Sequence, residues 1–541
     1  MKNAGRFIIF NNVKLPINAS LEEAFSVARA RAKRLGLPRD LEYSVYRRSV
    51  DARKRNSIQF VYSIAARGEI PTLCESVLKA QDASVVIPES VTATYGRSTL
   101  TAPPVIVGSG PCGLFAGLIL AENGYRPVII ERGGSVKERI AATERLINER
   151  RLDIDTNVQF GAGGAGTFSD GKLVTRINDP LTSYVLEKFI AHGAPDDIRF
   201  IAKPHIGTDV LSGIVESIIE RIVSLGGRIE YHTRFECTRH DNAGRVYAVH
   251  TNRGDIPSGA VILAVGHSAR DTYMHLMSSG VITEAKAFSV GMRIEHLTKD
   301  IDRALYGDYA GNPVLGHAEY NLSNDTKSRG VYTFCMCPGG VVVPATSELY
   351  GVVVNGMSES SRGGVNSNSA VVCSIFKEDY GSTPLKAIDF QRKIEREAFR
   401  AGGGDYSAPI ITVGDFLSDR LSAEPGRIKP SYMNGGVRLA RPESYLPRTV
   451  TDSIKRALTA FDKKINGFAA PDAILTGAET RTSAPIRITR DPQTRLAPGY
   501  TNFYPAGEGA GYAGGITSAA IDGIRTALAL MNNYKPIDIC R

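Results

Sequence analysis

The chain has 541 residues, 43% of them hydrophobic and 22% charged, with a formal net charge of +9. This length and apolar content predict a globular protein of several domain-sized units and exclude an intrinsically disordered chain. No run of about 18 uninterrupted apolar residues is present, so we expect no transmembrane helix and no membrane association. The seven cysteines are odd in number and scattered. They therefore predict a reducing cytoplasm and exclude a disulfide framework.

Residues 1–95 predict a small domain with the order strand, helix, strand, strand, helix. The helix over 21–35 has one apolar face, which needs a sheet to cover it. We expect a ferredoxin-like α+β domain without an iron site, because Cys74 stands alone. This segment contains fifteen Lys and Arg residues and nine Asp and Glu residues. This surplus leaves open an ordinary solvated surface, an anion-binding loop over 47–55, or an acidic protein or nucleic acid partner.

Residues 105–132 contain the pattern of a dinucleotide-binding βαβ unit. An apolar strand leads into Gly108-Ser109-Gly110-Pro111-Cys112-Gly113, a small apolar helix follows, and a second strand ends at Glu131-Arg132. The three glycines give the tight turn, the close approach of a pyrophosphate and the close packing of the helix. Glu131 stands where a carboxylate accepts hydrogen bonds from a ribose. We therefore predict cofactor contacts from Gly108, Gly110, Pro111, Cys112, Gly113, Glu131 and Arg132.

Two later segments select FAD over NAD. Residues 501–516 resemble the second FAD signature of the glutathione-reductase superfamily, and the strand ending at Gly266 resembles its crossing strand, with Val265 in place of threonine. The resemblance implies that Glu508, after Gly507, binds the ribityl chain. It also implies that Gly514, Gly515 and Ile516 bring a helix N-terminus beneath the flavin ring, where its dipole stabilises the reduced anion.

A glycine-rich segment at 160–173 follows an amphipathic helix over 135–152, in which Val136, Ile140, Ile147 and Leu152 are expected to face inward. Four glycines within six residues indicate a backbone that bends tightly or approaches a ligand. A flexible loop is the alternative, but nearby polar side chains favour contact with the flavin. The predicted contacts are Gly163, Gly164, Gly166, Thr167, Lys172 and Leu173.

Residues 271–477 change to mixed strands and loops, and we predict an inserted α+β domain for substrate recognition. Arg293, His296, Arg481 and Arg487 are candidates to bind an anionic substrate, although each is equally a candidate structural ion-pair partner. Cys335 and Cys337 raise a thiol hypothesis. A Cys-x-Cys bridge needs a strained ring, so we expect strand residues with both sulfurs on one face. No zinc site is expected, because the ligands do not cluster.

Together these motifs resemble one family, the bacterial uncharacterised FAD-dependent dehydrogenases of about this length. The resemblance rests on residues 48–54, 163–173, 335–340 and 479–485, with Ala484 where a second serine is expected. It implies an α/β fold: a Rossmann-like FAD-binding domain of glutathione-reductase type, formed by 96–270 and 478–541, with an inserted substrate domain over 271–477 and an N-terminal ferredoxin-like domain over 1–95.

The resemblance implies FAD and redox chemistry but supplies no substrate. One nucleotide fingerprint is present, so NAD(P)H is expected, if at all, as a transient electron donor. The leading hypothesis is a cytoplasmic FAD-dependent dehydrogenase or reductase that transfers a hydride through flavin N5 to or from a small molecule, for which an anion is one candidate. The alternatives are an RNA-modifying flavoprotein that uses the basic N-terminal domain and a non-catalytic flavin-binding interaction module.

Overall fold

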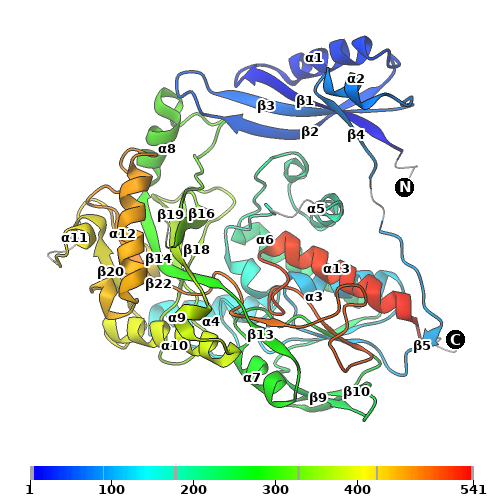
Figure 1. Cartoon of the computed structure of the whole chain (residues 1–541), viewed down its shortest axis with the longest axis vertical. Coiled ribbons are helices and arrows are strands. Elements are labelled where there is room, and N and C mark those ends of the chain that lie inside the picture. The colour runs from blue at the N-terminus through cyan, green and yellow to red at the C-terminus, as the bar shows by residue number, and fades with distance from the viewer. Residues whose placement is uncertain (1–4, 89–90, 176–178, 326–328, 422–424, 538–541) are drawn as a thin grey trace. The chain divides into compact units, whose positions relative to one another are not determined.

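The computed structural model describes residues 5–88, 91–175, 179–325, 329–421 and 425–537. The chain forms two compact units (Figure 1). The first contains residues 1–92 together with 176–205 and 299–318, and the second contains the remainder. The two later segments of the first unit were not assigned to the N-terminal domain by the sequence. Within the described residues, no helix combines the length and the apolar character needed to cross a bilayer.

The first unit contains an antiparallel four-stranded sheet with the order β2-β3-β1-β4. Its apolar face is covered by helix α1, whose Ala24, Ala28 and Ala32 are fully buried (Figure 1). Strand β4 was missing from the predicted order, and the second predicted helix, α2, spans five residues. The elements are β1 (Phe7–Pro16), α1 (Leu21–Arg34), β2 (Glu42–Asp51), β3 (Gln59–Arg67), α2 (Glu75–Lys79), β4 (Ala83–Val86), α5 (Leu181–Ala191), η2 (Asp196–Arg199), α8 (Thr298–Tyr306) and η3 (Gly307–Tyr309).

A five-stranded parallel sheet organises the nucleotide-binding part of the second unit, with the order β24-β12-β6-β7-β8. Its central strands are short and fully buried, as expected for a sheet covered on both faces. The antiparallel flap β11-β10-β9 lies between β8 and β12 in the chain. The strands are β6 (Val105–Val107), β7 (Val128–Ile130), β8 (Arg228–Glu230), β9 (Phe235–His240), β10 (Val246–Thr251), β11 (Gly254–Pro257), β12 (Val261–Leu263) and β24 (Phe503–Pro505).

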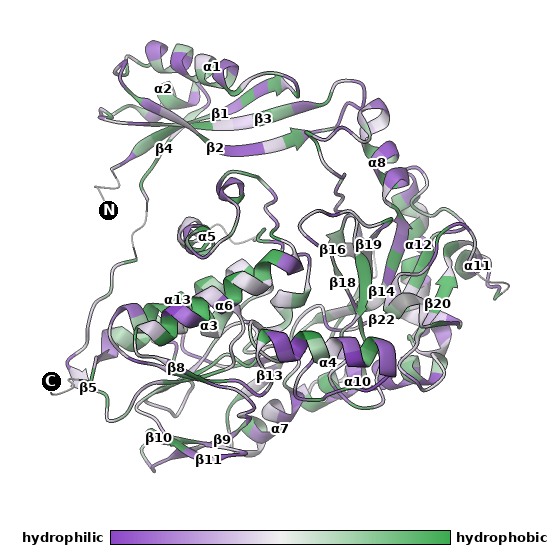
Figure 2. Ribbon diagram, turned by 180° about the vertical axis from the view of Figure 1, so that it is seen from behind, coloured by the Kyte–Doolittle hydropathy of each residue, from purple (hydrophilic) through white to green (hydrophobic). Residues whose placement is uncertain are grey.

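Helices α3 and α13 pack closely against each other beside this sheet. A Cβ atom at Gly523 of α13 would lie 2.1 Å from the carbonyl oxygen of Cys112 in α3. Figure 2 shows α3 as hydrophobic along most of its length, in accord with the burial of residues 112–121. The helices of this part are α3 (Pro111–Glu122), α4 (Val136–Glu149), η1 (Gly164–Phe168), α6 (Thr208–Ser224), α7 (Arg270–Ser278) and α13 (Ile516–Asn533).

Helix α4 corrects one prediction of the sequence. Ile140 is 40% exposed, and Arg139 is fully buried in its place. The Arg139 guanidinium donates to the carbonyl oxygens of Asn157 (3.1 Å), Val158 (2.8 Å) and Ala162. These three bonds satisfy backbone groups of the loop that leads into the glycine-rich segment, and they set the rotation of the helix.

The predicted insertion forms a seven-stranded sheet with the order β15-β16-β19-β14-β22-β20-β21. Its longest pair, β14 and β19, keeps an unbroken antiparallel register over ten residues. The strands of the sheet are β14 (Phe288–Leu297), β15 (Ser323–Asp325), β16 (Gly330–Cys337), β19 (Asn366–Ile375), β20 (Ala408–Thr412), β21 (Val437–Leu439) and β22 (Ile474–Glu479).

Helices and short strand pairs accompany this sheet. Strand β5 (Ser98–Thr99) pairs with β25 (Tyr534–Lys535). The other elements are β13 (Thr283–Ala285), β17 (Val341–Pro344), β18 (Val354–Met357), α9 (Lys377–Tyr380), α10 (Pro384–Ala401), α11 (Val413–Leu417), η4 (Tyr432–Gly435), η5 (Pro442–Ser444), α12 (Arg448–Asp462) and β23 (Ile486–Ile488).

Candidate functional site

A pocket in the second unit lies at the carboxyl ends of β6, β7 and β12, where ligands bind in open α/β sheets. All three glycine-rich motifs of the sequence contribute to it. Of the predicted cofactor contacts, those that line the pocket are Gly108, Gly110, Pro111, Cys112, Glu131, Arg132, Gly164, Gly166, Lys172, Gly266, Glu508, Gly514, Gly515 and Ile516.

The three glycines of the first run meet three different structural requirements. Gly108 has φ +100°, and a Cβ there would lie 2.5 Å from the Ala264 carbonyl oxygen, so it makes the turn. A Cβ at Gly113 would lie 1.9 Å from the Gly108 carbonyl oxygen, so Gly113 allows the close packing of the helix on the turn. Gly110 has open space around its Cβ position, with Gly164 as the nearest neighbour at 3.8 Å. That space is available to a ligand.

The second and third glycine runs contact the first and each other. A Cβ at Gly164, which has φ +62°, would lie 2.9 Å from the Cα of Gly110. A Cβ at Gly166 would lie 3.0 Å from a side-chain carbon of Ile516. Residues separated by some four hundred positions therefore enclose one space.

Both helix N-termini at this space lack a side-chain cap. Gly110 is the N-cap of α3, Gly515 is the N-cap of α13, and neither can offer a capping side chain. An uncapped helix N-terminus with exposed amides and a positive dipole end is a binding site for anions. Two such termini in one pocket suit a ligand with a phosphate at one point and an electron-rich ring at another.

Glu131 has a structural task that the sequence did not reveal. Its Oε2 accepts hydrogen bonds from the Ser109 amide (3.0 Å) and hydroxyl (2.7 Å). Its Oε1 accepts from the amides of Gly133 and Gly161, each at 3.0 Å. These four bonds match the capacity of a carboxylate. Glu131 therefore ties the first glycine turn to the end of β7 and to the second glycine segment, and its contact with a ribose stays a prediction.

Arg132, next in the chain, is held rigidly beside the pocket. Its guanidinium pairs with Asp155 (2.8 Å) and Asp271 (3.0 Å). It also lies over the ring of Phe160, 4.1 Å from the ring centroid. Its planar group is thus fixed by two carboxylates and one aromatic ring.

Glu508 and His267 are two titratable groups on the pocket wall with strongly shifted pKa values. Burial raises the pKa of Glu508 to about 7, and the neighbouring Lys286 opposes the shift. Burial lowers the pKa of His267 to about 3, and the positive charges of Arg481 and Arg270 add to this effect. His267 is therefore a neutral imidazole, hydrogen-bonded to Ser268 (2.9 Å). The sequence prediction missed His267, although its place directly after Gly266, beyond the end of β12, was the available signal.

Five predicted contacts support the pocket without lining it. The amide of Gly163 donates to Ser109, that of Gly507 donates to Asp522 (2.7 Å), and Leu173 accepts from Thr517. These hydrogen bonds connect the three glycine-rich motifs outside the pocket lining. The five residues are Gly113, Gly163, Thr167, Leu173 and Gly507.

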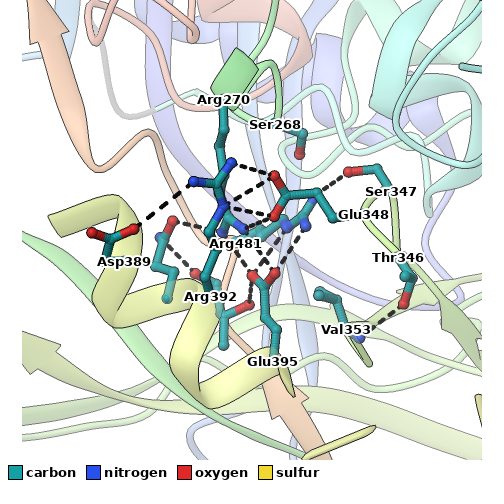
Figure 3. Close-up of polar contacts among 12 residues, drawn as sticks. Ser268, Arg270, Thr346, Ser347, Glu348, Val353, Asp389, Arg392, Glu395 and Arg481 are labelled. Carbon is teal, nitrogen blue, oxygen red and sulfur yellow. Dashed lines mark hydrogen bonds and ion pairs between the residues drawn. The ribbon is translucent and has the colours of Figure 1, made fainter. Parts of the chain in front are cut away.

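Arg481 also lines the pocket, as part of a buried charge network (Figure 3). Glu395 accepts from Arg481 (3.0 Å) and from Arg270 (2.7 Å), and Glu348 accepts from Arg270 (2.8 Å) and Arg392 (2.7 Å). The two guanidinium groups hold the pKa of Glu395 well below its usual range despite burial. The Arg481 charge is therefore already matched within the protein.

The position of Arg293 decides between the two alternatives that the sequence left open. It does not line the pocket, and its side chain is fully buried. The guanidinium makes a bidentate pair with Glu479 (3.0 and 3.1 Å) and donates to Asn368 (2.7 Å). The structural ion-pair alternative is the one realised here.

His296 and Arg487 likewise lie away from the pocket. The His296 ring is buried, and its Nε2 lies 2.7 Å from the carbonyl oxygen of Phe468. Arg487 is an exposed residue of β23, with its guanidinium over the ring of Tyr512. Neither position brings the charge to a ligand in this pocket.

The two cysteines of β16 differ from the expected pair on one sheet face. The register against β19 shifts between Phe334 and Cys337, and Cys335 has φ +46°. This β-bulge breaks the alternation of side chains. Cys335 lines the pocket, whereas Cys337 is fully buried.

Comparisons with known protein families match three parts of the chain. A model described as FAD binding domain matches residues 101–151, and one described as FAD-dependent protein, C-terminal domain-like, matches residues 287–482. A domain of unknown function matches residues 8–67. The first match covers the glycine fingerprint of residues 108–113 at the pocket. The uncapped helix ends and the glycine runs of the pocket suit the FAD that this match indicates. FAD is the cofactor of this protein.

An uncharacterised protein from Clostridium beijerinckii is 42% identical over 525 residues, which are 96% of this chain and 98% of that protein. Among solved structures, L-amino acid deaminase from Proteus vulgaris is 13% identical with a TM-score of 0.34, covering 82% of this chain and 97% of that one. Glycine oxidase from Bacillus cereus is 10% identical with a TM-score of 0.33, covering 81% and 99%. TM-scores this low do not establish a shared fold.

Proposed function

The chain belongs to the same family as the uncharacterised Clostridium beijerinckii protein, and we propose that it is an FAD-dependent oxidoreductase acting on a small molecule. The single observation that carries the proposal is the meeting of three glycine runs and two uncapped helix N-termini at one pocket. Such a pocket suits a long ligand with a pyrophosphate and a ring that becomes anionic. When bound, the flavin ring supplies hydride transfer at N5.

The residues at the two helix ends divide the pocket into two parts. The N-terminus of α3, with Gly110, binds the pyrophosphate, and the wall near Arg132 encloses the adenosine. The N-terminus of α13, with Gly515 and Ile516, would hold the flavin ring and would stabilise negative charge on it. Glu508 accepts a hydrogen bond from the ribityl chain. The first unit belongs to the ferredoxin-like class by its βαββαβ order.

The substrate occupies the part of the pocket beyond the flavin ring. Residues from the seven-stranded sheet and its connections form this wall, among them Phe334, Cys335, Asn355, Glu479 and Thr482. Arg481 adds a guanidinium whose hydrogen bonds already go to Glu395 and Ser347. The geometry therefore favours a small molecule and does not favour an anion over a neutral one.

The electron donor is a nicotinamide nucleotide that binds transiently over the flavin. The five-stranded parallel sheet carries one nucleotide fingerprint. Elsewhere in the described residues, strands pair in parallel only between β5 and β25 and between β20 and β21. A second resident dinucleotide therefore has no second fingerprint to bind.

The test begins with the purified protein. Its bound cofactor is released, identified and counted against the protein, and about one FAD per chain is expected. The holoprotein is then mixed anaerobically with NADH and with NADPH, and the oxidised-flavin absorbance is followed. Bleaching by one of them supports the proposed oxidoreductase. A chain that carries no flavin and binds none contradicts it, and bound flavin that no donor reduces contradicts the nicotinamide half.

A further inference from the structure

We propose that Cys335 and Cys337 form a redox-active pair that exchanges two electrons with the bound flavin and reacts with a small disulfide in the pocket. This inference rests on the proposed function, because it needs FAD in the same pocket. It assigns a reactive group to the wall formed by β16, which the family matches leave without a role.

The β-bulge makes the pair asymmetric. Phe334 is opposite Ala370 and Cys337 is opposite Asn368, so Cys335 and Met336 together face one residue of β19. Bulges re-aim side chains and occur beside active sites. Here the bulge gives Cys335 access to the pocket and leaves Cys337 behind it. An attacking thiol in front and a resolving thiol behind are the arrangement that thiol–disulfide exchange needs.

Contacts hold the two thiols together. Cys337 Sγ lies 3.3 Å from the carbonyl oxygen of Cys335 and within hydrogen-bonding reach of the Cys335 thiol, so its single proton is available to either acceptor. Arg293 donates to the same carbonyl (3.1 Å) and lies 3.9 Å from Cys337 Sγ. The buried Arg293 therefore positions both residues of the pair.

The electrostatics favour a thiolate at the front position. A hydrogen bond with the Cys337 side chain, together with the positive charges of Arg293 and Lys172, lowers the pKa of Cys335, against the effects of burial and Asp170. The pKa of Cys337 is raised well above its ordinary value, because the thiolate beside it and burial both oppose a second negative charge. Cys335 is thus the nucleophile, and Cys337 keeps its proton until it is needed.

A bridge between these residues is feasible and strained. Two residues of an extended strand span about 6.6 Å from Cα to Cα, at the upper end of the range that disulfides bridge. The bulge at Cys335 bends the strand. Strained disulfides have higher reduction potentials and are the labile, catalytic ones. The strained ring of a Cys-x-Cys bridge was the reason not to expect a structural disulfide here. The same strain favours a disulfide that is easily reduced.

The chemistry balances as follows. The Cys335 thiolate attacks a substrate disulfide, one S–S bond breaks, a mixed disulfide forms, and one substrate thiolate leaves and takes a proton. Cys337 then gives up its proton and attacks Cys335 Sγ, which forms the protein disulfide and releases the second substrate thiol. Two electrons and two protons, supplied through the bound flavin by its nicotinamide donor, break the protein disulfide and restore both thiols.

The test measures the number of electrons that the protein takes up and the mass of one tryptic peptide. Trypsin releases residues 330–362 as a single fragment that contains Cys335 and Cys337 and no third cysteine. Holoprotein oxidised with diamide is expected to give this fragment lighter by two hydrogen atoms. Anaerobic titration of the same sample with dithionite is expected to consume two electrons beyond those taken by the flavin.

Three variants provide the controls. Cys335→Ser and Cys337→Ser are expected to abolish both the mass change and the additional electrons. Cys373→Ser, a change of another buried cysteine in the same sheet, is expected to keep both. In Cys337→Ser, hydroxyethyl disulfide is expected to leave a mixed disulfide on Cys335 in this fragment.

The outcomes separate the two proposals. A holoprotein with bound FAD that consumes electrons for the flavin alone and yields an unchanged fragment overturns the dithiol pair and leaves the oxidoreductase intact. A protein that binds no FAD overturns the proposed function. A mixed disulfide that forms on this fragment equally in Cys335→Ser and in Cys337→Ser overturns the assignment of Cys335 as the attacking thiol.

Discussion

Gly164 approaches Gly110 so closely that a Cβ atom on Gly164 would lie 2.9 Å from the Cα atom of Gly110. The two residues belong to different glycine runs, and each lines the FAD pocket. The contact explains why both positions need glycine. Gly110 leaves space for the ligand, and Gly164 leaves space for Gly110. It also makes the two positions separable by mutation.

Gly110→Ala is expected to weaken FAD binding at least about tenfold, which corresponds to about 1.4 kcal/mol. The methyl group would occupy the open space beside the N-terminus of α3, where we propose that the pyrophosphate binds, while the Gly110 φ of −70° suits alanine. The ratio of flavin to protein after purification and the affinity of the FAD-free protein for FAD are the measurements. Unchanged affinity would place the pyrophosphate elsewhere.

Gly213→Ala is the matched control. Gly213 lies within α6, and its Cβ position has nothing within 4 Å. Removing a helical glycine is expected to stabilise the protein by about 0.5 to 1 kcal/mol. This variant should therefore unfold at higher urea and keep a normal complement of FAD.

The backbone of the glycine-rich motifs could be predicted from the sequence, for a physical reason. Turns such as the one at Gly108 are encoded locally, because a left-handed backbone or a close contact requires glycine at that position. The strand, turn and helix around it, and the uncapped N-terminus at Gly515, therefore followed from short stretches of sequence.

The substrate half could not be predicted in the same way. The bulge at Cys335 depends on pairing with β19, some thirty residues later. The burial of Arg139 depends on three carbonyl groups of another loop, and that of Arg293 on Glu479. Partners distant in the sequence decide these positions, so a basic residue in the sequence alone does not reveal whether it binds substrate or closes an ion pair.

Glu508→Gln is expected to stabilise the FAD-free protein at high pH and to have little effect at low pH. Burial raises the folded-state pKa of Glu508 from 4.5 to about 7. Between these values the folded chain binds more protons than the unfolded chain, so the wild type loses stability as the pH rises. Glutamine removes that loss.

Thermal unfolding of FAD-free wild type and Glu508→Gln at pH 5 and pH 8 checks this expectation. The advantage of the variant should grow from the lower to the higher pH, because other titrating groups are common to both proteins. An advantage that does not change with pH would show that the carboxylate is not desolvated. In the holoprotein the same substitution tests the proposed contact with the ribityl chain.

Arg139→Met is expected to lower the free energy of unfolding by about 3 kcal/mol, because three buried carbonyl groups lose their donor. It is also expected to weaken FAD binding, since those carbonyls belong to the loop that leads into the glycine-rich segment. Urea unfolding and flavin content are the measurements. Lys137→Met, an exposed change on the same helix, is the control and should leave both values near those of the wild type.

Glu395→Gln is expected to destabilise the protein by about 3 kcal/mol or more at neutral pH, because Arg270 and Arg481 then share a buried site without their common carboxylate.

The effect of Glu395→Gln on stability has a defined pH dependence. The folded-state pKa of Glu395 is held below its ordinary value of 4.5, so its stabilising contribution is complete above that value and decreases as the pH falls below it. Urea unfolding of both proteins at pH 7 and pH 4 should therefore give a smaller difference at pH 4. A difference that stays constant would mean that packing, and not charge, makes Glu395 necessary. Because Arg481 lines the pocket, the position of its guanidinium and the KM for the substrate are expected to change together in this variant.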